Sequence, residues 1–504
     1  MKKLNNKGFA ITTVLYSLLV MATLVLFLLI GNLSFERKST DNFVSDIEDE
    51  LNQFVFDENG NEGGPDEIIP ENLVADYVLN PGPNGNIYDD GIDTFITGDD
   101  PNNYIWYSGK LWRAVSVNND TMTVKLVTQW NISAVSFNSS STNFEGSYME
   151  SWLNDITVDG FLGNLRDYEN FIVTDSVWDV TMDDTALGSL QRPSGAATVT
   201  DAVGLLNMYE YQTSYMGTTY ENGYLNNGLD WWTLTPYNSS SIRYVHYIGS
   251  NYMGALSGVI SGVRPSINLK FSVEVVGGEG TIDNPYRLKG DDDSNLQGTM
   301  LSSRYSGEYV RFGSDENNLY RIVSHENGRG TKIASAKPLK KSSGKFMTSI
   351  FGSDVAFLTS NTIGSFLNGD YLTNYVGSTY INMIEDSTIW YLGTVGDGAS
   401  YKLAKYTNMT DNILISSTTT AKVGLLRFSE LMAGQFDVTG NNTSYWTLTP
   451  NSNSYVCLIS DTGQTLSKKV SYDYGVRPSL NLKSNVVITG GTGTKSDPFT
   501  ISLQ

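Results

Sequence analysis

Residues 262–270 read GVRPSINLK and residues 475–483 read GVRPSLNLK, so one nine-residue stretch occurs twice in this 504-residue chain. Two further pairs keep the same order and nearly the same offset: WTLTP at 232–236 and 446–450, and GGEGTIDNPY at 277–286 against GGTGTKSDPF at 490–499. A period of about 213 residues is too long for a solenoid of short repeats. The sequence therefore predicts two tandem domains of one type.

Weaker matches between these anchors extend the repeat in both directions. They preserve the chain order: LWR at 111–113 with LYR at 319–321, SWLN at 151–154 with SFLN at 365–368, and VGLL at 203–206 with VGLL at 423–426. Alternating apolar residues on both sides of the Asn118-Asn119-Asp120 turn predict a β-hairpin. We expect two mixed α+β, strand-dominated domains, at residues 77–289 and 300–504, joined by a linker at 290–299.

The N-terminal segment has a different character. Lys2, Lys3 and Lys7 precede an apolar run of 22 residues from Phe9 to Ile30. A helix of that length crosses a hydrocarbon core of ~30 Å, and lysines before the run place the N-terminus in the cytoplasm. An amphipathic pattern continues the predicted membrane-spanning helix over 9–56, and a Gly-rich linker follows at 57–76. The sequence thus predicts a single-pass cell-membrane protein with an extracellular remainder.

The Lys7-Gly8-Phe9 step before the apolar run resembles the leader of type IV prepilins and pseudopilins. The resemblance implies removal of residues 1–8 by a prepilin peptidase, methylation of the Phe9 amine, and assembly with other pilin-like subunits through the helix. Thr13 stands where that family usually has the Glu that pairs with a neighbouring amine. The departure favours a minor subunit, such as one at a filament tip. A signal anchor that is never processed is the alternative.

The bulk composition excludes some classes of function. The chain has 54 acidic and 33 basic residues, a formal net charge of −21, and no basic cluster, so we expect no nucleic-acid partner. Cys457 is the single cysteine, which excludes an intrachain disulfide and a thiolate metal cluster. An aromatic content of 12% with 30 Tyr is typical of β-rich exported proteins and suits binding surfaces.

The order of motifs in each unit, from Leu-Trp-Arg through Ser-Trp-Leu-Asn and Trp-Trp-x-Leu-Thr-Pro to Gly-Val-Arg-Pro, resembles a family of poorly characterised bacterial surface domains. Those domains are similar to the C-type-lectin-like and formylglycine-generating-enzyme-like folds. The resemblance concerns the fold and carries little information about activity. The leader and the duplication together predict adhesion or recognition, with a glycan or a surface protein as ligand. The predicted fold class is accordingly a long membrane-spanning N-terminal helix followed by two tandem C-type-lectin-like domains.

Six repeated side chains are candidates for binding or for the core: Trp231, Trp232, Arg264, Tyr445, Trp446 and Arg477. A Trp on an inward strand position and an Arg before Pro are more often structural, with the Arg paired to a carboxylate or to backbone carbonyls. If they are buried, binding is expected in the loops Asn131–Glu145, Thr213–Asp230 and Tyr391–Ile413.

Catalysis is not predicted. His246 and His325 are the only histidines, they are not equivalent in the two units, and no nucleophile elbow, zinc motif or phosphate loop is present. The formylglycine-generating enzymes use paired cysteines, which Cys457 alone cannot supply. Asp291-Asp292-Asp293 lacks the pattern of a calcium loop and favours a solvated linker. No catalytic, cofactor or metal residue is assigned.

The function predicted from the sequence is therefore a pilin-like surface subunit that displays two lectin-like domains for adhesion or recognition. Two alternatives stay open at this point. The first is an assembly-priming pseudopilin or plain anchored protein with no ligand. The second is an extracellular enzyme that acts on polymers through a pair of carboxylates.

Overall fold

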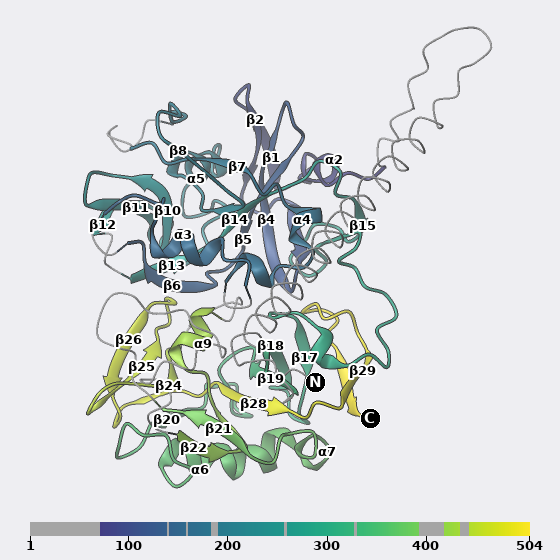
Figure 1. Ribbon diagram of the computed structural model, residues 1–504, viewed down its shortest axis with the longest axis vertical. Coiled ribbons are helices and arrows are strands. Elements are labelled where there is room, and N and C mark those ends of the chain that lie inside the picture. The colour runs from purple at the N-terminus through teal and green to yellow at the C-terminus, as the bar shows by residue number, and fades with distance from the viewer. Residues whose placement is uncertain are drawn as a thin grey trace, which may run out of the picture. The chain divides into compact units, whose positions relative to one another are not determined.

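Two main sheets form the framework of each repeat (Figure 1). The structure is a computed structural model that describes residues 71–504, except 139–140, 158–159, 183–189, 257–259, 327–329, 393–417 and 434–442. Residues 72–504 form one unit by their internal contacts, so both repeats belong to the same body.

The predicted fold class is wrong in its first element, the membrane-spanning helix. The predicted helix over 9–56 lies outside the described residues. Within the described part of the chain the longest helices, α5 (Met208–Ser214) and α6 (Thr362–Asn368), have seven residues, and no helix is long and apolar enough to cross a membrane. A crossing helix needs about 20 apolar residues, whereas the apolar runs described here are short, buried strands.

The first repeat pairs a large sheet with a smaller one. The large sheet has nine strands in the order β15-β16-β3-β4-β5-β14-β9, with β1 and β2 attached beside β4. Its strands are β1 Gly85–Asp89, β2 Asp93–Gly98, β3 Tyr104–Tyr107, β4 Lys110–Asn118, β5 Val124–Thr128, β9 Val203–Gly204, β14 Ser266–Leu269, β15 Val275–Gly277 and β16 Tyr286–Leu288. β4 and β5 form the hairpin predicted around Asn118.

The smaller sheet of this repeat runs β12-β11-β10-β13-β6. Its strands are β6 Ser133–Ser136, β10 Trp231–Pro236, β11 Ser241–Val245, β12 Asn251–Leu256 and β13 Ile260–Val263. The other elements of the repeat are α2 Val74–Val78, α3 Tyr148–Leu153, α4 Tyr168–Phe171, α5 and the hairpin of β7 Ser176–Asp179 with β8 Thr198–Asp201.

The second repeat has two five-stranded sheets, β17-β18-β19-β28-β23 and β20-β27-β24-β25-β26. The strands of the first are β17 Tyr309–Arg311, β18 Leu319–Glu326, β19 Gly330–Ser335, β23 Val423–Leu425 and β28 Pro478–Leu482; those of the second are β20 Thr348–Ile350, β24 Tyr445–Ser452, β25 Tyr455–Ile459, β26 Thr465–Lys469 and β27 Asp473–Gly475. The hairpins β21 Thr388–Tyr391 with β22 Thr418–Ala421 and β29 Val486–Gly490 with β30 Thr500–Leu503, and the helices α6, α7 Ser378–Ile381 and α9 Phe428–Ala433, complete it.

The duplication extends to topology and to single hydrogen bonds. β4-β5-β14-β9 has the order of β18-β19-β28-β23, and both smaller sheets match strand for strand. Asn154, which ends the first SWLN motif, donates to the carbonyl of Val203 and accepts from its N–H, at 3.0 and 2.9 Å. Asn368 makes the same two bonds to Val423, at 2.9 and 3.1 Å. The repeated Asn therefore fixes a helix end to a strand.

Candidate functional site

The six predicted site residues all lie in the interior, each at most 3% exposed. Arg264 donates through Nε to the carbonyl of Thr128 at 2.8 Å, and its guanidinium lies 4.6 Å from the Trp231 ring centre. Burial lowers the pKa of Arg264 to about 9. The Arg264 guanidinium donates to backbone carbonyls and lies against an aromatic face.

The second repeat reproduces this arrangement with Tyr445 in place of Trp231. Arg477 donates to the carbonyl of Ser335 at 2.8 Å and lies 5.2 Å from the Tyr445 ring centre. The indole N–H groups of Trp232 and Trp446 donate to the carbonyls of Val135 and Ser349. These side chains join strands within each repeat, and a ligand has no access to them.

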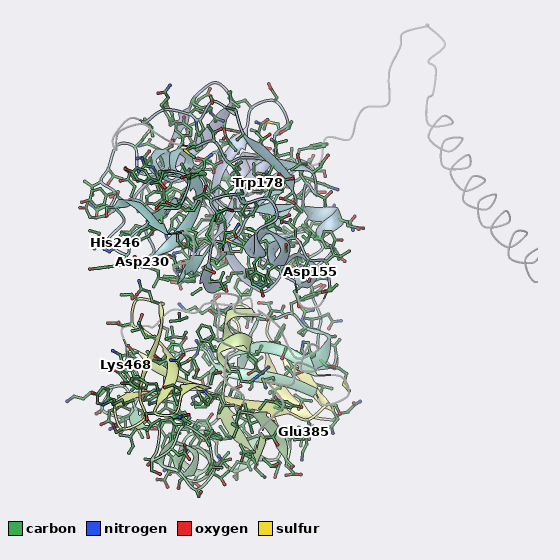
Figure 2. All side chains as sticks on the ribbon, turned by 60° about the vertical axis from the view of Figure 1, so that its left-hand side comes forward. Asp155, Trp178, Asp230, His246, Glu385 and Lys468 are labelled. Atoms are coloured by element: carbon green, nitrogen blue, oxygen red, sulfur yellow. The ribbon has the colours of Figure 1, made fainter. Side chains whose placement is uncertain are left out.

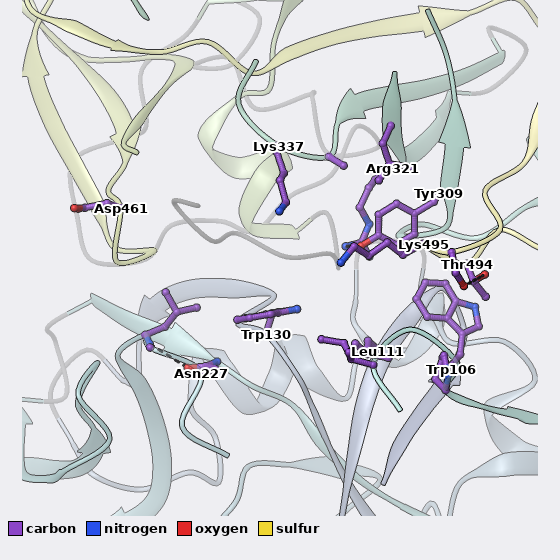
Figure 3. A pocket seen from close by; sticks show the side chains of 17 residues that line it. Trp106, Leu111, Trp130, Asn227, Tyr309, Arg321, Lys337, Asp461, Thr494 and Lys495 are labelled. Carbon is purple, nitrogen blue, oxygen red and sulfur yellow. Dashed lines mark hydrogen bonds between the residues drawn. The ribbon is translucent and has the colours of Figure 1, made fainter. Parts of the chain in front are cut away.

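A cavity of about 350 Å³ lies instead between the repeats (Figure 3). Both repeats line it, and its described lining is Trp106, Leu111, Trp130, Asn227, Gly228, Leu229, Ile282, Pro285, Tyr309, Leu319, Arg321, Ala336, Lys337, Asp461, Thr494, Lys495 and Ser496. The loop Asn227–Leu229 belongs to the predicted binding loop Thr213–Asp230. Most of the predicted loop Tyr391–Ile413 lies outside the described residues.

Equivalent positions of the two repeats meet in this cavity. Gln129 donates its N–H to the Leu111 carbonyl, and Ala336 donates in the same way to Leu319, at 2.9 and 2.8 Å. Trp130 and Lys337 each follow the donor residue, so they occupy matching places. The Gly-Gly-x-Gly-Thr repeat likewise aligns Ile282 with Lys495.

The matching positions differ in chemistry. Trp130 and the exposed Ile282 of repeat 1 match Lys337 and Lys495 of repeat 2. Trp106 of repeat 1 and Arg321 of repeat 2 also line the cavity. Figure 3 shows the tryptophans on one side and Lys337 and Arg321 on the other. One cavity therefore combines an apolar aromatic wall with a basic wall.

Arg321 is held rigidly in the basic wall. Its Nε donates to the carbonyl of Gly307 at 2.7 Å, Nη2 donates to the carbonyl of Gly109 at 3.3 Å, and the guanidinium lies 4.4 Å from the Tyr309 ring centre. Gly109 belongs to the first repeat, so this arginine also joins the repeats. Asp461 is the one carboxylate in the described lining, and the cavity is basic in a chain of net charge −21.

An ion-pair cluster also joins the two repeats. Arg166 of repeat 1 makes two bonds to the carboxylate of Asp293, at 2.6 and 2.7 Å, and Arg304 of repeat 2 bonds the same carboxylate at 2.6 Å. The hydrogen bond from Arg166 lowers the pKa of Asp293 to about 2. Bidentate arginine–carboxylate pairs of this kind are geometrically specific.

The neighbouring Asp291 is buried rather than solvated, contrary to the expectation for this acidic run. It is 5% exposed and accepts the N–H of Ser108 at 3.1 Å. Burial, reinforced by the charge of Glu308, raises its pKa to about 7. Asp230 of repeat 1, labelled in Figure 2, also accepts a hydrogen bond from Gln464 of repeat 2.

A shared apolar core continues this interface. Leu426, Phe428, Leu431, Cys457 and Ile459 of repeat 2 belong to the same buried cluster as the core of repeat 1. The walls of the cavity are therefore parts of one packed body, and their spacing is fixed before any ligand arrives.

Residues 361–484, about a quarter of the chain, match the family model described as a domain of unknown function (DUF6273). The match begins at Asn361, the N-cap of α6, whose counterpart in repeat 1 is Ser147, the N-cap of α3. No curated protein and no solved structure matches the chain. The pilin-like, adhesin and transmembrane assignments receive no support from these comparisons or from the described helices, and they are not retained.

Proposed function

We propose that this chain is a binding protein in which the two repeats together hold one small anionic ligand with a flat apolar face. The observation that carries the proposal is the cavity between the repeats, which Trp130 and Ile282 line together with the matching Lys337 and Lys495. A duplicated module with two separate sites would keep similar residues at these places. Here each repeat supplies a different half of one site.

The chemistry of the two walls favours an acidic sugar, such as a uronic acid glycoside. A tryptophan face packs against the C–H face of a sugar ring, and ammonium groups at the opposite wall attract a carboxylate. The volume of about 350 Å³ is at the small end of ligand sites. A basic cavity on an acidic protein also concentrates anions locally.

The small number of carboxylates in the described lining of the cavity favours binding over hydrolysis. A glycosidase places two carboxyl groups on either side of the scissile bond, roughly 5–9.5 Å apart. In the described lining, Asp461 is the single carboxylate. The described lining therefore lacks the second carboxyl group that hydrolysis of a glycoside would require.

Titration calorimetry of the full chain with methyl glucuronide and methyl glucoside tests this function, because the two probes differ by one carboxylate. We expect saturable binding of the glucuronide, and at least tenfold weaker binding in the Lys337→Ala/Lys495→Ala double variant. Lys345→Ala, which removes an exposed lysine outside the cavity lining, is the matched control and should bind as wild type. Absence of saturable binding of both probes to the folded protein would overturn the proposal.

A further inference from the structure

A buried lysine and glutamate face each other in the interior of the second repeat. Lys332 on β19 donates from Nζ to Oε1 of Glu430 on α9 at 2.7 Å, and their side chains are 4% and 1% exposed. The Lys332 ammonium lies 4.9 Å from the ring centre of Trp390, which is itself buried. The other oxygen of Glu430 accepts the N–H of Arg427 at 2.8 Å, so the glutamate is held in place.

Asn481 on β28 lies directly across the sheet from Lys332. The antiparallel register pairs these two residues, which places their side chains on one face with Cβ atoms roughly 5 Å apart. The Asn481 side chain is buried, and its Oδ1 accepts no hydrogen bond in the described structure. A buried amide oxygen without a donor is rare in native proteins and calls for an explanation.

We propose that Lys332 and Asn481 become joined by an intramolecular isopeptide bond, with Glu430 transferring the protons. Lys332 first passes a proton from Nζ to Glu430 along their hydrogen bond, which leaves a neutral amine and a neutral acid. The Nζ lone pair attacks Cγ of Asn481, and a C–N bond forms as the carbonyl becomes tetrahedral. Glu430 returns a proton to the amide nitrogen, the old C–N bond breaks, and ammonia leaves. The second proton of Nζ passes to Glu430, which then gives it up to the departing ammonia.

The surroundings favour this reaction on physical grounds. A low-dielectric site penalises the charged lysine–glutamate pair, so proton transfer to the neutral pair costs less there than in water. The product replaces a buried ammonium and an unsatisfied amide with one secondary amide. Asn481 is only 3% exposed, so little water reaches its carbonyl carbon and aminolysis is favoured over hydrolysis. No oxidant, metal or cofactor is needed, and the proposal is independent of any ligand in the cavity.

The first repeat contains the same four residue types in equivalent places: Lys125, Glu210, Asn268 and Trp178. Trp178 is labelled in Figure 2. The lysine and glutamate side chains are more exposed there, at 18% and 9%. Water stabilises their charged forms, so proton transfer to the neutral pair costs more free energy than in the second repeat. We expect the bond in the second repeat, with the first repeat as an internal comparison.

Peptide mapping of the full chain tests the proposal. The folded protein is incubated, denatured, digested with trypsin and analysed by mass spectrometry. We expect a branched peptide that joins the fragments of Lys332 and Asn481, lighter than their sum by one ammonia, with no cleavage after Lys332. Glu430→Gln keeps the hydrogen bond to the Arg427 N–H but cannot relay a proton, so the branched peptide should be lost or fall at least tenfold.

The matched variant Glu210→Gln should leave the branched peptide of the second repeat at the wild-type level. An intact Asn481 fragment and full cleavage after Lys332 in wild type would overturn the proposal, and circular dichroism of the same sample confirms that the protein was folded. A branched peptide equally abundant in wild type and Glu430→Gln would overturn the role of the glutamate.

Discussion

Two aspartates separated by one residue are expected to respond to pH in opposite directions. Burial raises the pKa of Asp291 from 3.8 to about 7, whereas the Arg166 hydrogen bond lowers that of Asp293 to about 2. The folded protein therefore binds the Asp291 proton more tightly than the unfolded chain does. The stability that this group contributes is fully present below about pH 4 and is lost as pH rises through 7.

The magnitude follows from the size of the pKa change. At 1.36 kcal/mol for each pKa unit, the step from 3.8 to about 7 corresponds to at most ~4 kcal/mol. Asp291→Asn removes the ionisation and keeps an oxygen for the Ser108 N–H. We expect the variant to have a free energy of unfolding about 1–2 kcal/mol higher than wild type near pH 5, which is already above the unfolded pKa, and roughly 2–4 kcal/mol higher near pH 8.

Asp293→Asn is the contrasting variant, because its carboxylate is stabilised by Arg166 and Arg304. It should lower the free energy of unfolding near pH 8 by about 2 kcal/mol. Urea unfolding followed by tryptophan fluorescence at both pH values measures the two effects. If Asp291→Asn lowers stability near pH 8 as Asp293→Asn does, Asp291 is an ionised, net favourable partner and the reasoning is refuted.

Three further predictions concern the repeated architecture and its interior. Asn154→Ala and Asn368→Ala each remove two hydrogen bonds between a helix end and a strand, so each should cost about 1–3 kcal/mol in urea unfolding; a cost below ~0.5 kcal/mol at both sites would contradict the bridging role. Gly204→Ala would place a Cβ 2.4 Å from the Trp178 ring and should destabilise by about 1–3 kcal/mol, while Gly277→Ala, with open space around its Cβ and no left-handed backbone, is the control that lacks the clash. Burial raises the pKa of Cys457 to about 12, so iodoacetamide at pH 8 should alkylate it at least tenfold more slowly in folded than in urea-unfolded protein, and equal rates would show that the thiol is accessible.

Much of the framework follows from repetition in the sequence. The motifs with Trp232, Trp446, Arg264 and Arg477 mark buried strands because a large or charged side chain in the interior needs fixed partners. The hairpin around Asn118 follows from alternation and turn residues. These features depend on contacts within one repeat, which a duplicated sequence shows twice.

The cavity depends on how the repeats pack and was not predicted. The equivalence of Trp130 and Lys337 follows from the hydrogen bonds that the preceding residues make to Leu111 and Leu319. Neither Trp130 nor Lys337 belongs to a repeated motif. The sequence does contain a signal for the cavity, because an uncharged residue in one repeat and a lysine at the same position of the other, as at Ile282 and Lys495, indicate that the repeats have diverged in function. The acidic run at 291–293 has the sequence of a solvated linker. Its partners Arg166 and Arg304 lie outside the run, and the sequence of the run does not show that its charges are paired.

The number of ligands bound by one chain tests the central claim most directly. Two independent modules would hold two ligands, whereas a single cavity shared by both repeats holds one. Calorimetric titration of the full chain with methyl glucuronide should give one site for each chain, and Trp130→Ala in repeat 1 and Lys495→Ala in repeat 2 should each weaken that one site. A stoichiometry of two, with each variant removing only one of two sites, would contradict the account.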